Sequence, residues 1–449
     1  MPLRLRQEIQ NLPRGLKHGE ARPTVADMPP LRPAAISLFA GAGGCSLGFK
    51  LAGYDIRYAA DIESDAVDTY RQNFPETFCE VADIRETQVG YLLKRAAVRT
   101  GELDILLGGP PCQGFSSAGA KSAADPRNSL LAHYVRILDG IRPKWFVMEN
   151  VEGLLTNAGG NHVVEAVEAF LDIGYSVNLE KVYAQGYGVP QRRKRVLIVG
   201  NRLGHDFEFP PTLTPFTGSI FRKSELTIGS ALTDLPATGN DPSIRLTYAS
   251  RPRNELQKWL RAGASDIADH YSAPLSAIQI ARVSRLLPGQ TMKHLPSHLQ
   301  HASFRKRAFR RVMDGMPVER RGGAPSGLKR LIADEPSLTI TSAATREFVH
   351  TLRECARLQT FPDRFDFCGN AASRIKQIGN AIPPLLAEVI AQHILQQYGF
   401  EPAIGSPSRP VLQYRLTRSE GMSPALLQTQ CKLAKLAGSS SEQLVLLAE

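Results

Sequence analysis

AAISLFAGAGG, residues 34–44, is a short apolar run that leads into a loop with three glycines. The run predicts a buried strand, and the glycines would let a ligand approach the backbone where a Cβ would block it. Further apolar runs bounded by turn residues follow, with one segment of helical periodicity between them. These stretches are YDIRYAADI, LDILLGG, SLLAHYVRILDGI (the helical one), KWFVMEN and RVLIVG. Repeated strand–helix–strand units predict an α/β fold with a doubly wound, mostly parallel sheet that binds ligands at the carboxyl ends of its strands.

The composition is that of an ordinary soluble protein, with 43% hydrophobic and 22% charged residues among 449. No apolar run is expected to span a bilayer, and the opening MPLRLRQEIQNLPRG lacks the apolar stretch of a secretory signal. The six cysteines include no CxxC pair, and no nearby histidines complete a zinc pattern. We therefore expect a cytoplasmic protein with reduced thiols and no metal.

Changes in composition along the chain predict its division into parts. The first residues are polar and proline-rich, the next stretch holds the strand–helix pattern, and a basic, irregular stretch follows. Order then returns with a helix that carries an apolar stripe, and the tail contains QTQCKLAKLAG, a candidate short helix. The expected parts are a flexible arm (1–33), a main α/β domain (34–200), a smaller irregular domain (201–338), a segment that returns to the main domain (339–400) and a C-terminal tail (401–449).

The formal net charge of +11 is concentrated in the irregular stretch. Residues 201–338 hold 20 Lys and Arg against 12 Asp and Glu, a surplus of +8, and RKRAFRR at 305–311 is the densest cluster. Such a segment suits a phosphate backbone, and a merely solvated surface is the alternative. The candidate nucleic-acid contacts in this cluster are Arg305, Lys306, Arg307, Arg310 and Arg311.

Two acids follow predicted strands at the edge where the glycine loop lies. Asp61 comes 20 residues after Gly41 and could accept hydrogen bonds from ribose hydroxyls, and Asp83 could receive an adenine amino group. FAGAGG departs from GxGxxG, so a dinucleotide is not the obvious ligand. The alternative is a tight glycine turn beside two surface acids.

GPPCQGFS, residues 109–116, places Cys112 directly after two prolines that fix the backbone. The loop follows the strand LDILLGG, so the thiol is expected at the same edge of the sheet. A thiolate is polarisable enough to attack an aromatic ring carbon. The alternative is that Cys112 is a small buried apolar residue, but such a residue does not require a fixed loop. For Cys45, by contrast, we prefer this packing interpretation.

Glu149 ends the strand KWFVMEN, where partial burial suits a proton donor. The alternative is an acid that stabilises the N-terminus of the following helix. In QRRKRV, alternate residues of an extended chain share a face, so Arg193 and Arg195 would point the same way and could hold a carbonyl oxygen, a carboxylate or a phosphate. For Arg192 and Lys194 a solvated basic edge is the preferred interpretation.

Six stretches, in this order, resemble the DNA (cytosine-5)-methyltransferase family of bacterial modification enzymes that use S-adenosylmethionine. They are FAGAGGCSLGF, GGPPCQGFS, MENVEG, QRRKRV, RECARLQTFPDRF and GNAIPP. The resemblance spans residues 36–395 and implies a Rossmann-like catalytic domain with a target-recognition domain between QRRKRV and RECARLQ. It also implies a double-stranded DNA substrate, a monomeric enzyme and, by family habit, a restriction endonuclease that acts on the same site.

The resemblance assigns roles to residues that match the family's motifs. The implied catalytic residues are Cys112, Glu149, Arg193 and Arg195. The implied S-adenosylmethionine site comprises Phe39, Gly41, Ala42, Gly43, Gly44, Asp61, Ile62, Asp83, Ile84, Pro110 and Asn380. Gln113, Ser116 and Thr339 join the basic cluster as implied DNA contacts. The spacing in REFVHTLRECARLQ is tighter than in many relatives, which leaves the role of Arg346 and His350 open.

The implied reaction flips a cytosine out of the duplex and methylates carbon 5 while Cys112 is bonded to carbon 6. A relative that acts on transfer RNA would have a Cys-Phe-Thr triplet, which this chain lacks. An inactive DNA-binding regulator is less favoured because Cys112, Glu149 and Asn380 are all present. A dehydrogenase with a catalytic thiol would need a different glycine pattern. The bases that the protein recognises have no readable code in residues 201–338.

Overall fold

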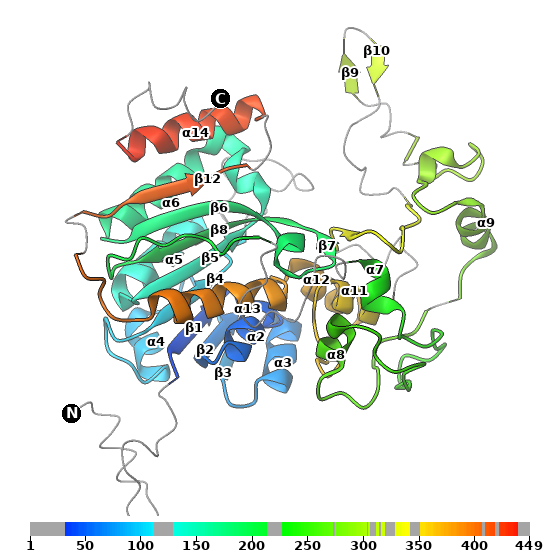
Figure 1. The fold of residues 1–449 in the computed structure, drawn as a ribbon, viewed down its shortest axis with the longest axis horizontal. Coiled ribbons are helices and arrows are strands. Elements are labelled where there is room, and N and C mark those ends of the chain that lie inside the picture. The colour runs from blue at the N-terminus through cyan, green and yellow to red at the C-terminus, as the bar shows by residue number, and fades with distance from the viewer. Residues whose placement is uncertain are drawn as a thin grey trace, which may run out of the picture. The chain divides into compact units, whose positions relative to one another are not determined.

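The chain is described by a computed structural model (Figure 1). The described residues are 32–111, 129–212, 227–272, 274–302, 304–305, 311–313, 316–318, 328–341, 351–405, 409–417 and 422–438. Several residues singled out above lie outside them: Cys112, Gln113, Ser116, Lys306, Arg307, Arg310, Arg346 and His350. For Arg311 only the backbone is described.

An eight-stranded sheet forms the centre of the fold, in the order β12-β6-β8-β5-β4-β1-β2-β3. β8 runs antiparallel to both β5 and β6, and every other neighbouring pair is parallel. The predicted mostly parallel sheet is therefore confirmed. The strands are β1 (Ala34–Leu38), β2 (Asp55–Asp61), β3 (Phe78–Val81), β4 (Ile105–Gly108), β5 (Trp145–Asn150), β6 (Ser176–Tyr183), β8 (Lys194–Asn201) and β12 (Leu412–Arg415).

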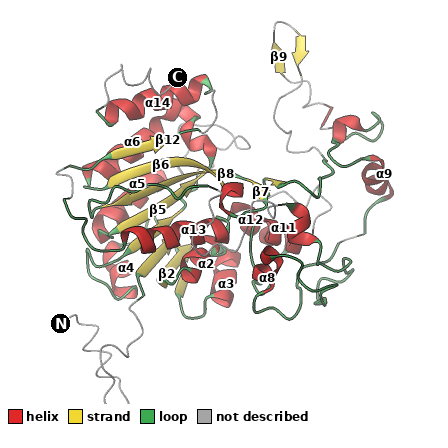
Figure 2. Cartoon of the chain, in the orientation of Figure 1, coloured by secondary structure: helices red, strands yellow, loops and turns green. Residues whose placement is uncertain are grey.

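Helices cover both faces of this sheet, which explains why the central strands are apolar throughout (Figure 2). Alternate residues of β1 enter different cores: Ala35 packs in one, and Ile36 in the other. The first core includes α2 (Gly44–Leu51), α3 (Ser64–Asn73), α11 (Leu352–Leu358), α12 (Ala371–Asn380) and α13 (Pro384–His393). The second includes α4 (Val89–Arg95), α5 (Ser129–Ile141), α6 (Asn161–Asp172) and α14 (Pro424–Leu436). Helices on both faces make the sheet doubly wound, as predicted.

The irregular stretch contributes to two different cores. Apolar residues of α7 (Ile228–Leu232) and α8 (Glu255–Arg261) pack into the same core as α2 and α11. Residues around α9 (Ala277–Arg285) instead form a small core of their own, made by Leu286, Met292, Leu295, Leu299 and Leu328. Short pairs complete this stretch: β9 (Arg311–Met313) with β10 (Met316–Val318), and β11 (Ser337–Leu338) with β7 (Gln191–Arg192). The boundaries near 200 and 338 stay predictions.

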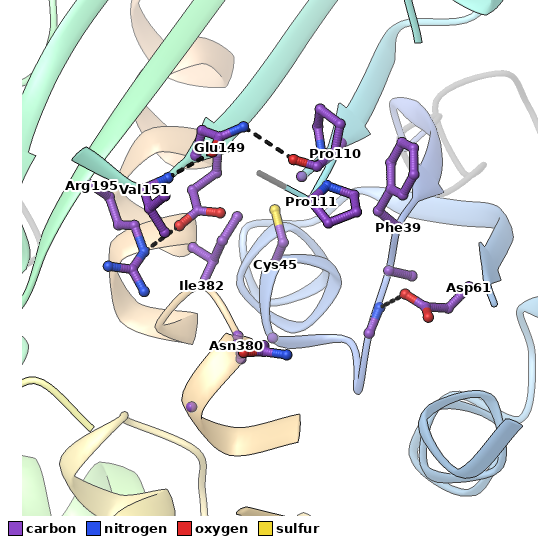
Figure 3. A pocket seen from close by; sticks show the side chains of 18 of the residues that line it. Phe39, Cys45, Asp61, Pro110, Pro111, Glu149, Val151, Arg195, Asn380 and Ile382 are labelled. Carbon is purple, nitrogen blue, oxygen red and sulfur yellow. Dashed lines mark hydrogen bonds and ion pairs between the residues drawn. The ribbon is translucent and has the colours of Figure 1, made fainter. Parts of the chain in front are cut away.

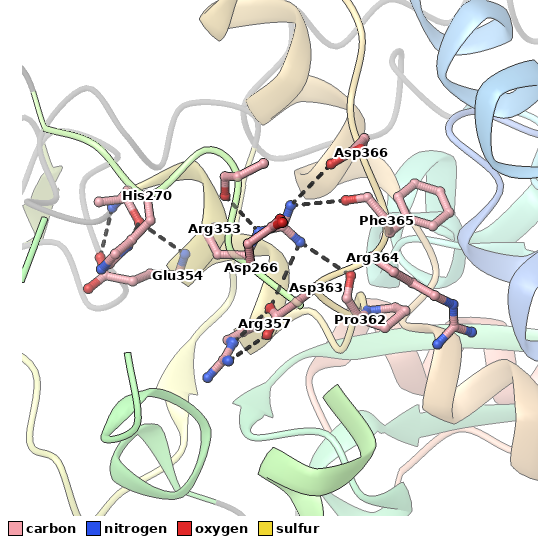
Figure 4. A network of polar contacts seen from close by, with 12 residues as sticks. Asp266, His270, Arg353, Glu354, Arg357, Pro362, Asp363, Arg364, Phe365 and Asp366 are labelled. Carbon is pink, nitrogen blue, oxygen red and sulfur yellow. Dashed lines mark hydrogen bonds and ion pairs between the residues drawn. The ribbon is translucent and has the colours of Figure 1, made fainter. Parts of the chain in front are cut away.

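A buried charge network joins the end of α7 and α8 to the returning segment. Figure 4 shows the part of it around Arg353, Arg357 and Asp363. The Arg357 guanidinium lies 2.5 Å from carboxylate oxygens of both Asp234 and Asp363, and all three side chains are fully buried. Arg353 donates to the carbonyl oxygens of Ala268, Pro362 and Phe365 at 3.0–3.2 Å. The two arginines of the RECARLQ stretch are thus held entirely by protein groups, and they fix α11 against residues 231–269.

The C-terminal part contains an element that the sequence did not indicate. Residues 412–415 form β12, which extends the sheet beside β6, and the expected short helix is present within α14. Within the described residues, the stretch 371–398 is long and apolar enough to cross a membrane by length and composition, with a mean hydropathy of 1.2 over its most apolar 18 residues. It contains α12, α13 and a π-helical turn (Ile394–Tyr398), and 61% of that 18-residue window is buried, as in the core helix of a folded domain.

Candidate active site

A cavity of about 1310 Å³ opens where the carboxyl ends of β1, β2, β4 and β5 meet (Figure 3). Because β8 is antiparallel to β5, its first residues lie at this same edge, opposite the last residues of β5. The ends of six segments therefore line the cavity: the loop after β1, the ends of β2, β4 and β5, the start of β8 and the turn after α12. This is the edge at which parallel α/β sheets bind ligands.

The glycine loop follows β1 and has left-handed backbone at three positions: Phe39 (φ 53°), Gly41 (φ 53°) and Gly43 (φ 94°). A Cβ added at Gly41 would meet no atom of the described residues within 4 Å, so this position faces open space. At Gly44 it would lie 2.5 Å from the Ile382 carbonyl oxygen, so the returning segment packs directly on the loop. Phe39, Gly41, Ala42 and Gly44 line the cavity.

Two residues expected in the cofactor site face the protein interior instead. A Cβ at Gly43 would lie 2.5 Å from the Phe74 ring, which makes this glycine a packing requirement between the loop and α3. Ile84 is 7% exposed and belongs to the second core rather than to the cavity lining. Neither residue lines the cavity.

The acids and the apolar residue expected at the strand ends do reach the cavity. Asp61 accepts hydrogen bonds from the backbone N–H of Gly41 at 2.8 Å and of Glu63 at 3.0 Å, and burial raises the pKa of its carboxyl. Ile62 leaves 59% of its surface exposed at the cavity, an unusual position for a large apolar side chain. Asp83 is held by Arg85, whose hydrogen bonds lower the pKa of this carboxyl.

Glu149 and Arg195 form an ion pair inside the cavity. Arg195 Nε lies 2.5 Å from Glu149 Oε1, and each side chain is 11% exposed. Cys45 also lines this part of the cavity (Figure 3), and burial, with the charge of Glu149 as a smaller cause, raises the pKa of its thiol. A thiol held protonated in this way is a poor nucleophile, which agrees with the packing role expected for it.

The end of β5 is tied to the two prolines before Cys112. Asn150 donates from Nδ2 to the Pro110 carbonyl oxygen at 3.0 Å, while its Oδ1 accepts from the Val151 N–H at 2.9 Å. Pro110 and Pro111 both line the cavity. The last described residue before Cys112 is therefore at the cavity, beside the Glu149–Arg195 pair.

Arg193 and Arg195 have different environments, although the sequence suggested a shared face. Arg193 is fully buried between strands β7 and β8 and does not line the cavity. It donates to three carbonyl oxygens: Ile340 at 3.1 Å, Gly379 at 2.9 Å and Ala381 at 2.8 Å. The last two flank Asn380, which lines the cavity. Arg193 thus holds the segments that bring Thr339 and Asn380 to the site.

Sequence reasoning missed two features of the site. Gln191, the uncharged first residue of QRRKRV, is fully buried, accepts from the Ile340 N–H at 2.9 Å and donates to Gln359 Oε1 at 2.6 Å. Glu63 and Lys376 face each other across the cavity rim, 2.9 Å apart. Glu63 could have been expected at the cavity, because it directly follows Asp61 and Ile62. Nothing in the local sequence indicates that Lys376 lies there. Thr339, an expected DNA contact, lines the cavity and donates to the Arg192 carbonyl oxygen at 2.8 Å.

Comparisons of the chain with known proteins all point to the family that the sequence motifs resemble. Residues 34–396 match the family model for C-5 cytosine-specific DNA methylases. The type II methyltransferase M.AgeI of Thalassovita gelatinovora is 30% identical in an alignment that covers 80% of this chain and 98% of that protein. M.DdeI of Desulfomicrobium norvegicum is 33% identical, with coverages of 80% and 88%. Among solved structures, a prophage-encoded E. coli protein assigned as a DNA modification methyltransferase superposes with a TM-score of 0.60 at 25% identity, covering 81% of this chain and 98% of that one.

Proposed function

Because the chain belongs to the C-5 cytosine-specific DNA methylase family and is a DNA (cytosine-5)-methyltransferase, we propose a specific substrate and mechanism for it. The enzyme flips a cytosine out of a particular double-stranded sequence, binds it covalently through Cys112 and methylates carbon 5 with S-adenosylmethionine. It acts as a monomer in a bacterial cytoplasm, as the modification half of a restriction–modification system whose endonuclease cuts the same site. The observation that carries the proposal is the meeting of the glycine loop, the Pro110–Pro111 pair and the Glu149–Arg195 pair at one cavity.

The cavity fits S-adenosylmethionine. Gly41 leaves open space above the loop, Asp61 is a carboxyl at the end of β2, and Ile62 offers an exposed apolar surface on which an adenine ring could pack. We propose that these three residues, with Phe39, Gly44, Asp83 and Asn380, hold the cofactor. When bound, S-adenosylmethionine supplies the electrophilic methyl group. No metal takes part in the proposed reaction.

The protein groups activate the base in a fixed order. Glu149 and Arg195 must first leave their mutual ion pair, and the Glu149 carboxylate takes up a proton from solvent as it does so. The Cys112 thiolate then forms a bond to carbon 6 of the flipped cytosine, Glu149 donates this proton to ring nitrogen 3, and Arg195 binds the carbonyl oxygen. Electron density pushed to carbon 5 makes it nucleophilic enough to accept the methyl group. A water-mediated base then removes the carbon-5 proton, the Cys112 sulfur leaves as thiolate, and ring nitrogen 3 returns its proton to Glu149.

Arg193 and Thr339 have supporting roles in this proposal. Arg193, which is buried and bonded to three carbonyl oxygens, positions Asn380 and the Thr339 segment rather than touching the base. Thr339 contacts DNA from the cavity rim, and Gln113 and Ser116 are further DNA contacts in this proposal. The basic residues at 305–311 contact phosphates, so affinity for DNA should fall steeply with salt. Salt-independent binding would remove that stretch from the DNA interface.

The experiment that tests the function compares Cys112→Ser with the wild type and with Cys431→Ser, a substitution of an exposed cysteine. Transfer of labelled methyl groups to duplex DNA should vanish only in Cys112→Ser, while DNA binding survives. Bisulfite sequencing of host DNA with and without the gene supplies the recognition site. In the presence of S-adenosylmethionine, a duplex carrying 5-fluorocytosine at that site should then form a denaturant-stable adduct with wild-type protein. After methyl transfer carbon 5 carries fluorine in place of the proton whose removal releases Cys112, so the enzyme stays bound. An active Cys112→Ser enzyme, or no adduct, would refute the covalent mechanism.

A further inference from the structure

The segment 151–161, called the wall below, lines the cavity next to Glu149 as far as Asn157 and continues directly behind it into three consecutive residues with left-handed backbone. Ala158 (φ 48°), Gly159 (φ 60°) and Gly160 (φ 76°) close the second of two 3₁₀ segments, Glu152–Leu155 and Asn157–Gly160, that follow β5. An alanine seldom adopts such a conformation unless its surroundings hold it there. The wall therefore depends on contacts from outside itself.

Helix α14 supplies those contacts from the C-terminal end of the chain. Thr429 is fully buried, and its Oγ1 donates to the Leu155 carbonyl oxygen at 2.5 Å. A Cβ added at Gly160 would lie 2.1 Å from this same Oγ1, so helix and wall are as close as the backbone allows. Lys432 Nζ donates to the Gly159 carbonyl oxygen at 2.7 Å and to Asn161 Oδ1 at 2.5 Å. Thr429 and Lys432 thus hold the left-handed segment from its two sides in the chain: Thr429 binds before it, at Leu155, and Lys432 binds at its end, at Gly159 and Asn161.

The wall is continuous with the groups that the proposed reaction uses. Val151, Gly153 and Thr156 line the cavity, and the next residue back along the chain, Asn150, binds the Pro110 carbonyl oxygen. Lys181 of β6 holds Glu152 from the other side at 2.8 Å. A shift of the wall would therefore reach Glu149 and the start of the Cys112 loop. The cofactor loop after β1 is two strands away from β5, about 10 Å.

We infer that Thr429 and Lys432 are positioning residues for methyl transfer, acting through the wall at 151–161; the inference rests on the proposed function. Residues 397–449 lie beyond the part of the chain that matches the family model. In this proposal, β12 and α14, which belong to that C-terminal part, stabilise the base-binding side of the site. The helix is anchored independently of these two residues by Leu426 and Leu433, which are buried in the second core.

The test measures single-turnover methyl transfer and the dissociation constant of S-adenosylmethionine separately. Thr429→Val keeps the side-chain shape but removes the hydroxyl, and Lys432→Met keeps the length but removes the charge. Each should slow transfer by about 10- to 100-fold, the cost of displacing a catalytic group by around 1 Å, with cofactor affinity unchanged. Thr429→Ser restores the donor and should restore the rate. Lys435→Met, at an exposed lysine on the same helix, should match the wild type.

Three outcomes overturn the inference: wild-type transfer rates in both variants, a loss of cofactor affinity in step with the rate, or no rescue by serine. The last two would show that α14 supports the fold in general. If Thr429→Val does not fold, Lys432→Met decides alone, since its side chain is only partly buried. A wild-type protein that transfers no methyl group to DNA would instead refute the proposed function, which keeps the two failures distinct.

Discussion

Arg195 Nε and Glu149 Oε1 lie 2.5 Å apart in a cavity where both side chains are 11% exposed. The pair joins two strands, β5 and β8, that run in opposite directions and meet at the ligand-binding edge of the sheet. In the proposed mechanism the same two groups bind the cytosine ring. The pair in the free protein therefore keeps both groups oriented and compensates their charges until the base enters.

Because Glu149 and Arg195 are paired, we expect substitutions of the two residues to have strongly non-additive effects on the rate of methyl transfer. Glu149→Gln removes the proton donor and should slow methyl transfer by about 10² to 10⁴, and Arg195→Met removes the carbonyl ligand and should cost about 10² to 10³. The double variant should be little worse than the slower single variant, because the two groups act as a unit. Single-turnover assays measure all three. Arg99→Met, which breaks a surface ion pair with Glu102, serves as the control. If the rate loss of the double variant equals the product of the two single losses, Glu149 and Arg195 act independently and the prediction is wrong.

The position of Arg193 predicts a loss of stability rather than of chemistry alone. Arg193→Met leaves three carbonyl oxygens without their donor and should lower the free energy of unfolding by roughly 3 kcal/mol or more. Affinity for S-adenosylmethionine should fall with it, because Asn380 lies between two of those carbonyls. Urea unfolding and calorimetric titration test this. Full stability with abolished transfer would instead make Arg193 a substrate contact.

The buried network around Arg357 predicts another large effect. Arg357→Met would remove the nearest positive charge from two buried carboxylates, leaving Asp234 with Arg261 at 3.4 Å and Asp363 with Arg353 at 4.0 Å. The loss should cost about 3 kcal/mol of unfolding free energy. Arg364→Met changes an exposed arginine next to Asp363, in the loop after α11, and should stay within about 0.5 kcal/mol. Comparable losses in the two variants would show that the network does not stabilise the fold.

Glu388 on α13 predicts a pH-dependent stability. Burial raises the pKa of its carboxyl from 4.5 to about 7, and its Oε2 has no hydrogen-bond partner among the described residues. The folded state therefore favours the protonated form, so stability is fully present below pH 4.5 and is lost as pH rises through about 7. Glu388→Gln should match the wild type near pH 4.5 and be more stable by about 3 kcal/mol at pH 8.

Urea unfolding at both pH values measures this difference. Glu401→Gln, at an exposed glutamate, should show no such divergence from the wild type. If the free energy of unfolding depends on pH in the same way for Glu388→Gln and the wild type, the Glu388 carboxyl is ionised in the folded protein without a loss of stability, and the prediction is wrong.

The exposed apolar surface of Ile62 predicts a role in cofactor affinity. Ile62→Ala removes about three carbon groups from the cavity and should weaken binding of S-adenosylmethionine about tenfold or more. Val81→Ala shortens another exposed apolar residue, 49% exposed near the end of β3 and outside the cavity lining, and should leave affinity unchanged. Equal affinities for Ile62→Ala and the wild type would place the adenine elsewhere.

Local patterns were sufficient for much of the fold and part of the site. The apolar runs became the strands of the sheet, and Asp61, Ile62 and Glu149 lie at the strand ends where they were expected. The direction of β8 could not be predicted, because a run buried on both faces looks the same in either direction. That direction is what brings Arg195 to Glu149.

The sequence by itself determined the class of fold, the family and the set of residues at the strand ends, because these depend on periodicity and on short motifs. Only the tertiary structure decided which members of each motif face the cavity. Ile62 is exposed there and Ile84 is in the core, and Arg195 pairs with Glu149 while Arg193 binds backbone carbonyls. Such differences depend on which distant segment packs against a residue. The helical pattern of α14 is visible in the sequence, but nothing in the local sequence shows that Thr429 packs against Leu155, 274 residues earlier in the chain.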